Sequence, residues 1–167
     1  MAQARRVARL RRTAAGLALA LLAASCGGGS DEGSGPAQPQ VLESEDPKTG
    51  CGAVVRFPSE GASHLDQGEK GSYRTQPPTS GKHAPRWGST GTHSKAITDE
   101  VQVHNLEHGH IVIQYVPGGI DAALLDGLVA LANTQPRWIL LAPRAPGRFQ
   151  PAAQLAFTAW RVAQVCS

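Results

Sequence analysis

The sequence predicts an α+β fold: a single small domain with a mixed β-sheet, one packed helix and long loops, behind an N-terminal tether. Three observations lead to this prediction. Short apolar, β-branched runs bounded by Pro or Gly indicate strands at 53–57, 110–115 and 138–142, of which 110–115 is expected to be buried. Leucines recur at helical spacing over 120–133. Between the first two of these strands, residues 59–98 are dominated by Gly, Ser, Thr, Pro and Lys, which indicates a long loop with a functional role.

Residues 1–25 are predicted to be a lipoprotein signal peptide. Five arginines precede an apolar run over 14–24 that is shorter than the roughly 20 residues needed to span a bilayer. The run ends in Leu-Ala-Ala-Ser followed by Cys26, which resembles a bacterial lipobox. That resemblance implies cleavage before Cys26 and attachment of lipid to its sulfur. The alternative is an ordinary secretory signal with a cysteine there by chance.

Residues 26–50 are predicted to be a lipidated, flexible tether and 51–167 a globular domain with a histidine cluster. The stretch 27–40 is rich in Gly, Ser and Pro and cannot bury a core, so folded structure is expected to begin near Val41 or Cys51. We therefore expect an extracytoplasmic protein held to the cell membrane by its lipid anchor.

The charge of the mature chain excludes one class of function. Five of the 16 basic residues and none of the 13 acidic residues precede Cys26, so the remainder carries 11 basic and 13 acidic groups, a net of −2. Nucleic-acid binding would require a clustered basic face, which this composition does not provide. We therefore expect no nucleic-acid partner, and the sequence identifies no protein partner.

The two cysteines that remain, Cys51 and Cys166, are predicted to form a disulfide. In an exported chain two leftover cysteines usually pair, and these would link the start of the folded domain to its end. Thiolate metal ligation or a redox role is the competing interpretation. It is disfavoured because the cysteines are far apart in sequence and form no C-x-x-C motif.

The helix over 120–133 is expected to be amphipathic. Asp121 lies in its first turn, where the helix dipole favours a negative charge. Its predicted apolar face consists of Leu124, Leu128 and Leu131, with Leu125 and Ala132 beside them. Residues 153–165 fit a strand and a helix almost equally; we expect a strand, with Leu155, Phe157 and Ala159 on one side.

The most informative feature is a cluster of histidines. His104, Glu107, His108 and His110 lie within seven positions, and His83 lies upstream in a turn-rich segment. As a helix, the cluster places His104 and His108 on one face with Gly109 as a C-terminal cap; as a strand, the three histidines of 104–110 share a side. Neutral imidazole is the commonest protein metal ligand, so either conformation suggests a metal site.

Two enzymatic interpretations of the cluster are weaker. The H-x-x-E-H spacing of His104, Glu107 and His108 matches the inverted zincin pattern, but no Glu follows Glu107 to supply a third ligand. A nucleophilic triad is disfavoured because Thr79 and Ser80 beside His83 are turn residues and no G-x-S-x-G motif exists.

Two strings carry a resemblance to a known family. Tyr73 followed by PPTSGKH ending at His83, and VHNLEHG over 103–109 leading into the strand, resemble a bacterial family catalogued as domain of unknown function 3105. The resemblance runs from about His64 to Cys166 and implies export but no established activity. It carries His83, His104, Glu107 and His108. Lys82, His93 and His110 depart from the family pattern, and the two histidines are left out of the predicted site.

The sequence therefore predicts a surface-anchored lipoprotein of unestablished activity that binds a divalent metal through His83, His104, Glu107 and His108. Imidazole and carboxylate without thiolate suit Zn²⁺ or Cu²⁺. Met1, the only methionine, would leave with the signal, which excludes a Met-rich Cu(I) site. Two alternatives stay open: an interaction module in which the cluster is a structural hydrogen-bond network, and a metal-dependent hydrolase. The residues favour binding over catalysis, and no catalytic residue is assigned.

Overall fold

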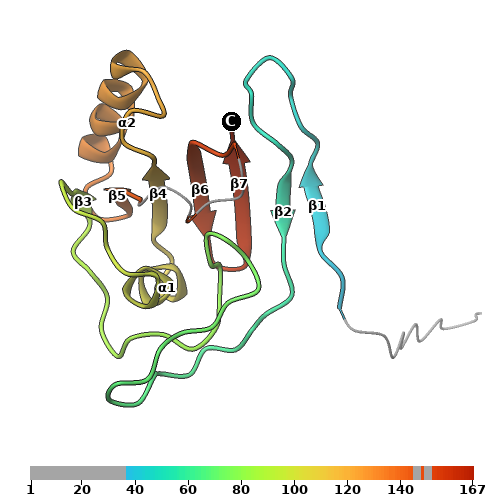
Figure 1. Ribbon diagram of the computed structural model, residues 1–167, viewed down its shortest axis with the longest axis vertical. Coiled ribbons are helices and arrows are strands. Elements are labelled where there is room, and N and C mark those ends of the chain that lie inside the picture. The colour runs from blue at the N-terminus through green and yellow to red at the C-terminus, as the bar shows by residue number, and fades with distance from the viewer. Residues whose placement is uncertain (1–36, 145–147, 149–151) are drawn as a thin grey trace, which may run out of the picture. The chain divides into compact units, whose positions relative to one another are not determined.

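The computed structural model describes residues 37–144, 148 and 152–167. The predicted signal peptide, Cys26 and the first part of the predicted tether lie outside the described residues. The described part contains one mixed sheet with the strand order β1-β2-β7-β6-β4-β5-β3 and two α-helices, as Figure 1 shows. The α+β prediction is confirmed.

The elements follow the chain in this order: β1 (Gln40–Glu43), β2 (Val54–Arg56), β3 (Gly91–Thr92), α1 (Asp99–Glu107), β4 (Ile111–Tyr115), α2 (Ala122–Thr134), β5 (Ile139–Pro143), β6 (Leu155–Ala159) and β7 (Val162–Cys166). Strands β3, β4 and β5 are parallel, and every other pairing is antiparallel. The three strands expected from β-branched runs appear as β2, β4 and β5.

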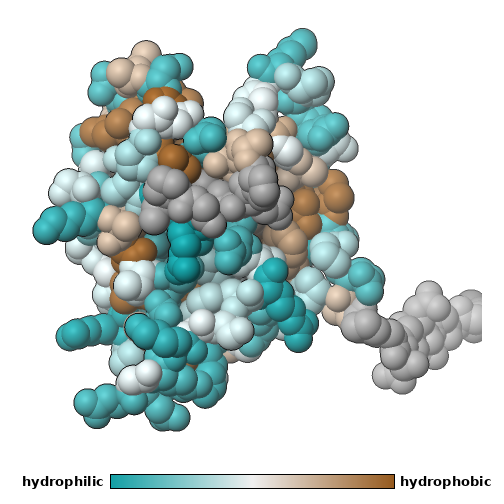
Figure 2. All heavy atoms as spheres, viewed as in Figure 1, coloured by the Kyte–Doolittle hydropathy of each residue, from teal (hydrophilic) through white to brown (hydrophobic). Residues whose placement is uncertain are grey.

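The long loop is also confirmed. Apart from the two-residue strand β3, the chain between β2 and α1 forms turns, bends and isolated bridges. It lies along one end of the sheet below α1 in Figure 1, and the face of it seen in Figure 2 is mainly hydrophilic. It is nevertheless ordered by buried residues: Thr79, Ser80 and His83 are completely buried.

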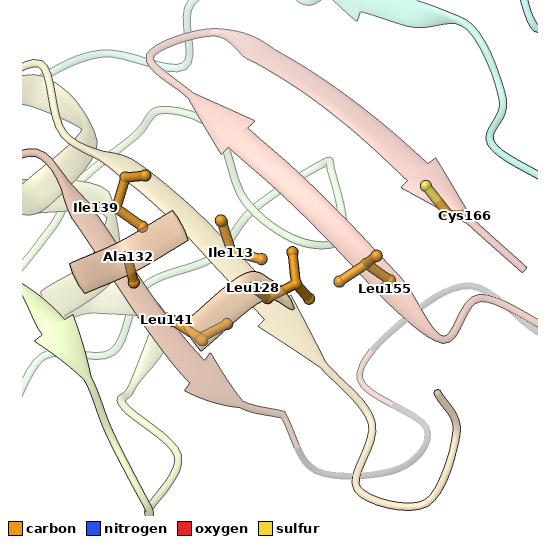
Figure 3. Packing of buried hydrophobic residues seen from close by; sticks show 7 residues of the cluster. All are labelled: Ile113, Leu128, Ala132, Ile139, Leu141, Leu155 and Cys166. Atoms are coloured by element: carbon orange, nitrogen blue, oxygen red, sulfur yellow. The ribbon is translucent and has the colours of Figure 1, made fainter. Parts of the chain in front are cut away.

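The two helices cover opposite faces of the sheet. Ile113 of β4 and Leu141 of β5 pack in one apolar cluster with Leu128 of α2, the cluster drawn in Figure 3. Their chain neighbours Val112 and Leu140 pack in a second cluster with Leu106 of α1. Because adjacent strand residues point to opposite faces, the central strands separate the two clusters and carry a buried residue at nearly every position.

The predicted apolar face of α2 is displaced in the structure. Leu128 and Ala132 are buried as expected, but Leu124 and Leu131 are 43% and 44% exposed. The helix instead packs through Leu128, Val129 and Ala132, with Ile120 just before it. The sequence did not reveal which side of the helix is buried, because leucines occupy both sides. Asp121 is the N-cap, and its side chain accepts a hydrogen bond from the backbone N–H of Leu124.

The expectation of a single packed helix is wrong, because residues 99–107 form a second one. The helical alternative for the histidine segment is therefore the correct one, and Gly109 follows it at a φ of +81°. Its buried side is largely polar, with Gln102, His104 and Asn105 beside Val103 and Leu106. That composition hid the amphipathic pattern on which helix prediction depends.

Residues 153–165 are β-structure as expected, but they form a hairpin rather than one strand. Strands β6 and β7 pair antiparallel, with Ala159 opposite Val162. The turn between them contains Trp160 and Arg161, and Arg161 adopts a φ of 63°. Neither residue is typical of tight turns, so the turn gave no sequence signal.

Regular structure begins at Gln40, beside Val41, the earlier of the two expected starts and before the domain boundary at residue 51. Strand β1, inside the expected tether 26–50, pairs with β2, and Asp46 forms a bridge with Cys51. Cys51 and Cys166 form the predicted disulfide across a separation of 115 residues. The disulfide therefore joins the segment between β1 and β2 to the end of β7.

Replacing both cysteines, as Cys51→Ser and Cys166→Ser, should lower the free energy of unfolding by about 2–5 kcal/mol, because the cross-link restricts the unfolded chain. Denaturant titration of oxidised wild type, reduced wild type and the double variant measures this. Reduced wild type should match the variant. Equal stability of all three proteins would contradict the assigned role of the disulfide.

Candidate functional site

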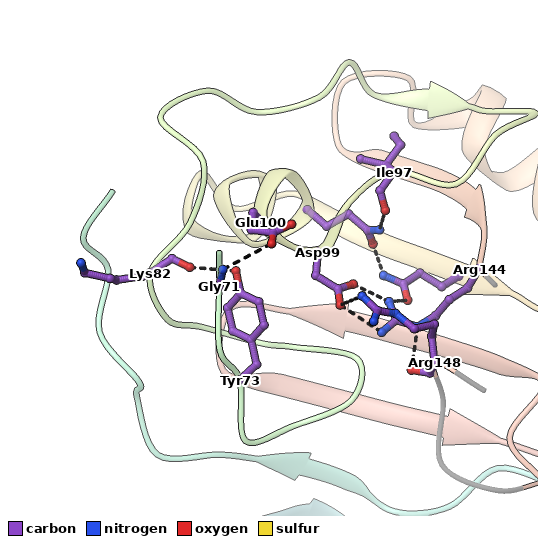
Figure 4. A network of polar contacts seen from close by, with 10 residues as sticks. Gly71, Tyr73, Lys82, Ile97, Asp99, Glu100, Arg144 and Arg148 are labelled. Carbon is purple, nitrogen blue, oxygen red and sulfur yellow. Dashed lines mark hydrogen bonds and ion pairs between the residues drawn. The ribbon is translucent and has the colours of Figure 1, made fainter. Parts of the chain in front are cut away.

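Helix α1 is held at its first turn by a buried ion pair. Nη1 of Arg144, at the end of β5, donates to Oδ1 of Asp99 at 2.6 Å and to Oε1 of Gln114 at 2.7 Å (Figure 4). Gln114 in turn donates to the side chain of Gln102. The Arg144 side chain is only 4% exposed, so losing its partner would leave a charge buried. The network fixes how α1 lies on the sheet.

The same turn of α1 also fixes the loop that carries His83. The backbone N–H of Ala84 donates to the carbonyl of Glu100 at 3.0 Å, and the Glu100 carboxylate accepts from the N–H of Gly71 at 3.3 Å. Burial alone would raise the pKa of Glu100, but hydrogen bonds from its own backbone N–H and that of Gly71 lower it. The carboxylate therefore stays charged and binds the loop to the helix.

Within the loop, Tyr73 fixes the conformation of the turn before His83. Its hydroxyl donates to the Lys82 carbonyl at 2.7 Å, and burial raises the pKa of Tyr73. Gly81 lies against the ring with a φ of +122°, and a Cβ at this position would approach ring atoms to 3.1 Å. A glycine is needed there both for the backbone angle and for the space.

A second loop segment runs beside the first and carries His64. The N–H of His83 donates to the Ser63 carbonyl at 3.1 Å, and the N–H of Leu65 donates to the His83 carbonyl at 2.8 Å. These bonds form a parallel bridge between His64 and His83. Two histidines that are 19 positions apart in sequence are thereby placed side by side, with ring centroids 5.1 Å apart.

The loop and the helix together form a cluster of four metal-ligand side chains. One ligand atom from each of His64, His83, His104 and Glu107 lies within 4.8 Å of all the others. His83 and His104 are 0% and 3% exposed, whereas His64 is exposed and the Glu107 side chain is 29% exposed. The cluster therefore has a buried half, formed by two imidazoles, and an outer half.

Backbone carbonyls set the tautomers of the two buried histidines. Nδ1 of His83 lies 2.8 Å from the Gly81 carbonyl, and Nδ1 of His104 lies 2.6 Å from the Ala84 carbonyl. A carbonyl oxygen only accepts, so both Nδ1 atoms must carry the hydrogen. In the neutral rings Nε2 is left as a lone-pair donor. This is the arrangement of metal-ligating histidines, whose other nitrogen is held by a backbone or carboxylate acceptor.

Nε2 of His83 is in an unusual environment. It lies 3.0 Å from Oε2 of Glu107, yet it is fully buried and lacks a hydrogen bond of acceptable geometry among the described residues. Because Nδ1 holds the hydrogen of the neutral ring, a lone pair here faces a carboxylate oxygen, and two acceptors cannot satisfy each other. Either a proton or a bound cation is therefore required between the two atoms.

His108, predicted as a ligand, is not part of this cluster. The helix ends at Glu107, and His108 is the C-cap residue. Its ring stacks on the ring of His104, with centroids 4.8 Å apart and planes at 7°. It also contacts the ring of Trp87, with centroids 4.5 Å apart. Helical spacing correctly placed His108 beside His104, but the loop that completes the cluster meets Glu107 instead. His108 braces the ring of His104.

Asn105 connects α1 to the segment that carries Trp87. Its Oδ1 accepts from the N–H of Gly88 and its Nδ2 donates to the Gly88 carbonyl, both at 2.9 Å. Nδ2 also lies 3.0 Å from Nδ1 of His110. Burial lowers the pKa of His110, and the nearby His108 adds to this effect, so the ring can accept this hydrogen bond. His110 is thus a partner of Asn105, outside the metal-ligand cluster.

Comparison with known proteins identifies the family. The model of a protein family of unknown function, DUF3105, matches residues 64–167, which is more than half of the chain. The chain belongs to the DUF3105 family. No curated protein and no solved structure shows significant similarity to it. The DUF3105 match begins at His64, so all four residues of the cluster lie within it.

Most side chains of the segment VHNLEHG, residues 103–109, have a defined place in the structure. His104 and Glu107 join the cluster, Asn105 holds Gly88, Val103 and Leu106 are buried, and His108 stacks on His104. Sequence reasoning missed His64. A signal did exist, since His64 opens the family region and belongs to the histidine-rich loop, but no spacing rule predicts a bridge between two irregular segments.

Proposed function

We propose that this DUF3105 protein binds a divalent metal ion through His64, His83, His104 and Glu107. The observation that carries the proposal is the buried Nε2 of His83, which faces the Glu107 carboxylate at 3.0 Å without a hydrogen bond. A cation placed there would satisfy the imidazole and the carboxylate together. His104 presents a second Nε2 of the same tautomer to the same cluster.

The burial pattern suggests how the ion would be captured. In a tetrahedral zinc site with bonds of 2.0–2.1 Å, ligand atoms lie about 3.3 Å apart. The cluster is looser, since its ligand atoms lie within 4.8 Å. Nδ1 of His83 and of His104 is held by a backbone carbonyl, whereas His64 is exposed and the Glu107 side chain is 29% exposed. Metal binding would thus use a preformed pair of imidazoles that the two outer side chains close.

The ligand set favours Zn²⁺ or Cu²⁺. Three imidazoles and one carboxylate match the borderline preference of both ions, whereas Ca²⁺ and Mg²⁺ prefer oxygen ligands throughout. Four protein ligands fill a tetrahedral site, so water activation by an open position, as a metal-dependent hydrolase needs, is not favoured. Among the predicted interpretations, the cluster best supports metal binding without turnover.

Metal should stabilise the tag-free protein, and the substitution His64→Ala should remove most of this effect. At a hundredfold excess over Kd, a ligand specific to the native state adds about 2.7 kcal/mol, which is several degrees of Tm. Thermal melts with Zn²⁺, Cu²⁺ or chelator measure the shift. Because the His64 side chain is exposed, the metal-free variant should melt close to wild type.

His93→Ala is the matched control. His93 belongs to the same loop, but its Nε2 bonds the Ser89 carbonyl at 2.8 Å outside the cluster. This variant should keep the full metal shift. If no metal shifts the wild-type Tm, metal binding is contradicted; the structural polar network then requires that truncation of Glu107 or His108 strongly destabilises the protein. Equal shifts for wild type and His64→Ala would mean that the ion binds elsewhere.

We further propose that the protein is a lipoprotein held at the outer face of the cell membrane by Cys26. The signal-like segment 1–25 and the lipobox-like residues before Cys26 support this. The disulfide between Cys51 and Cys166 agrees with an oxidising compartment. Among the described residues, no helix is long and apolar enough to cross a membrane.

Substituting Cys26→Ser should move the protein from the membrane fraction to the soluble fraction, since lipid attachment requires the cysteine sulfur. Fractionation of cells that produce either form, followed by immunoblotting, measures the distribution. A variant that stays with the membrane as firmly as wild type would place the anchor elsewhere in the chain.

A further inference from the structure

A patch of exposed aromatic and basic residues lies beside the candidate metal site. Trp87 and Trp138 are 52% and 54% exposed, although large aromatic side chains are usually buried. Both contact His110, with ring centroids 6.5 and 6.3 Å from it. Ile111, which is 42% exposed, is joined to the backbone of Trp138 by a 2.8 Å hydrogen bond. These four residues form one aromatic patch.

The charged residues next in sequence to the two tryptophans are basic, while Glu107 of the metal cluster lies three positions before His110. Each exposed tryptophan directly follows an exposed arginine, Arg86 before Trp87 and Arg137 before Trp138. The sequence contains no acidic residue in 70–98, 108–120 or 127–167, the ranges from which the patch is built. The mature chain as a whole is slightly acidic, with a net of −2. A basic region on an acidic protein indicates a specific anionic partner rather than general adhesion.

The combination of indole and guanidinium fits the interface of a lipid bilayer. Tryptophan is enriched at the level of the lipid headgroups, where its ring is partly apolar and its N–H can donate a hydrogen bond. Arginine beside it can bind headgroup phosphates. An acidic protein would use the same charges, but two solvent-exposed tryptophans separated by a histidine match the shallow, mixed polarity of a headgroup layer.

We propose that the aromatic patch docks the domain on an anionic membrane surface. The proposed lipid anchor at Cys26 would bring the domain close to such a surface, but the patch itself is independent of the anchor and of metal binding. With the patch on the membrane, Trp87 places the docked surface next to His104, with which its ring is in contact at 5.4 Å. The metal cluster would then lie at the edge of the membrane contact.

Co-sedimentation with vesicles tests the proposal on the chain from residue 27 onward, which lacks the lipidated cysteine and retains every described element. One set of vesicles contains phosphatidylcholine alone and the other an equal mixture with phosphatidylglycerol. The wild-type chain should bind the anionic vesicles, and added salt should weaken binding. Arg137→Gln should weaken binding about fivefold. Trp138→Ala should weaken it at least as much and keep the Zn²⁺-dependent Tm shift.

Leu124→Ala is the control, because Leu124 is also a large exposed apolar residue but lies on α2, in a helix that supplies none of the patch residues. It should bind like wild type. Three results would overturn the proposal: failure to bind anionic vesicles, equal binding by wild type and the Arg137 and Trp138 variants, or equally strong binding to soluble polyglutamate, which would identify an acidic protein as the partner.

Discussion

The candidate site depends on two hydrogen bonds from histidine rings to backbone carbonyls. The Gly81 carbonyl holds Nδ1 of His83, and the Ala84 carbonyl holds Nδ1 of His104. Both carbonyls belong to one short stretch of loop, so the loop sets the tautomer and direction of both rings at once. The turn at Gly81, the Tyr73 hydroxyl bond and the attachment of Ala84 to α1 all keep these carbonyls in place.

The helix and the sheet serve the same purpose from the other side. Helix α1 presents a buried polar face, which costs stability unless each group is paired. At the start of the helix Asp99 forms an ion pair with Arg144, and near its end Asn105 is hydrogen-bonded to the backbone of Gly88. Held at these two points, the helix presents His104 and Glu107 to the loop. The cost of this polar face is explained if its residues support a site.

The sequence predicted the elements whose signals are local and apolar. The strands β2, β4 and β5, the helix α2 and the disulfide followed from β-branched runs, leucine periodicity and cysteine number. Three features had no clear sequence signal: the hairpin turn at Trp160 and Arg161, the buried side of α2, and the helix over 99–107. Tertiary packing overrides weak local preferences at these places. At the site, the family string gave His83, His104 and Glu107. His64 and the stacking role of His108 depend on contacts between distant loop segments, which no spacing rule contains.

Long-range ¹⁵N NMR of the histidine side chains tests the proposed metal site most directly. Recorded with and without Zn²⁺, it measures which ring nitrogens of the two buried histidines carry hydrogen and which bind the ion. His83 and His104 should carry hydrogen on Nδ1. On binding the ion, the ¹⁵N signals of Nε2 of both rings and of one nitrogen of His64 should shift, while those of His93 should stay unchanged. Hydrogen on Nε2 in place of Nδ1 in both rings, with no response to Zn²⁺, would contradict this assignment.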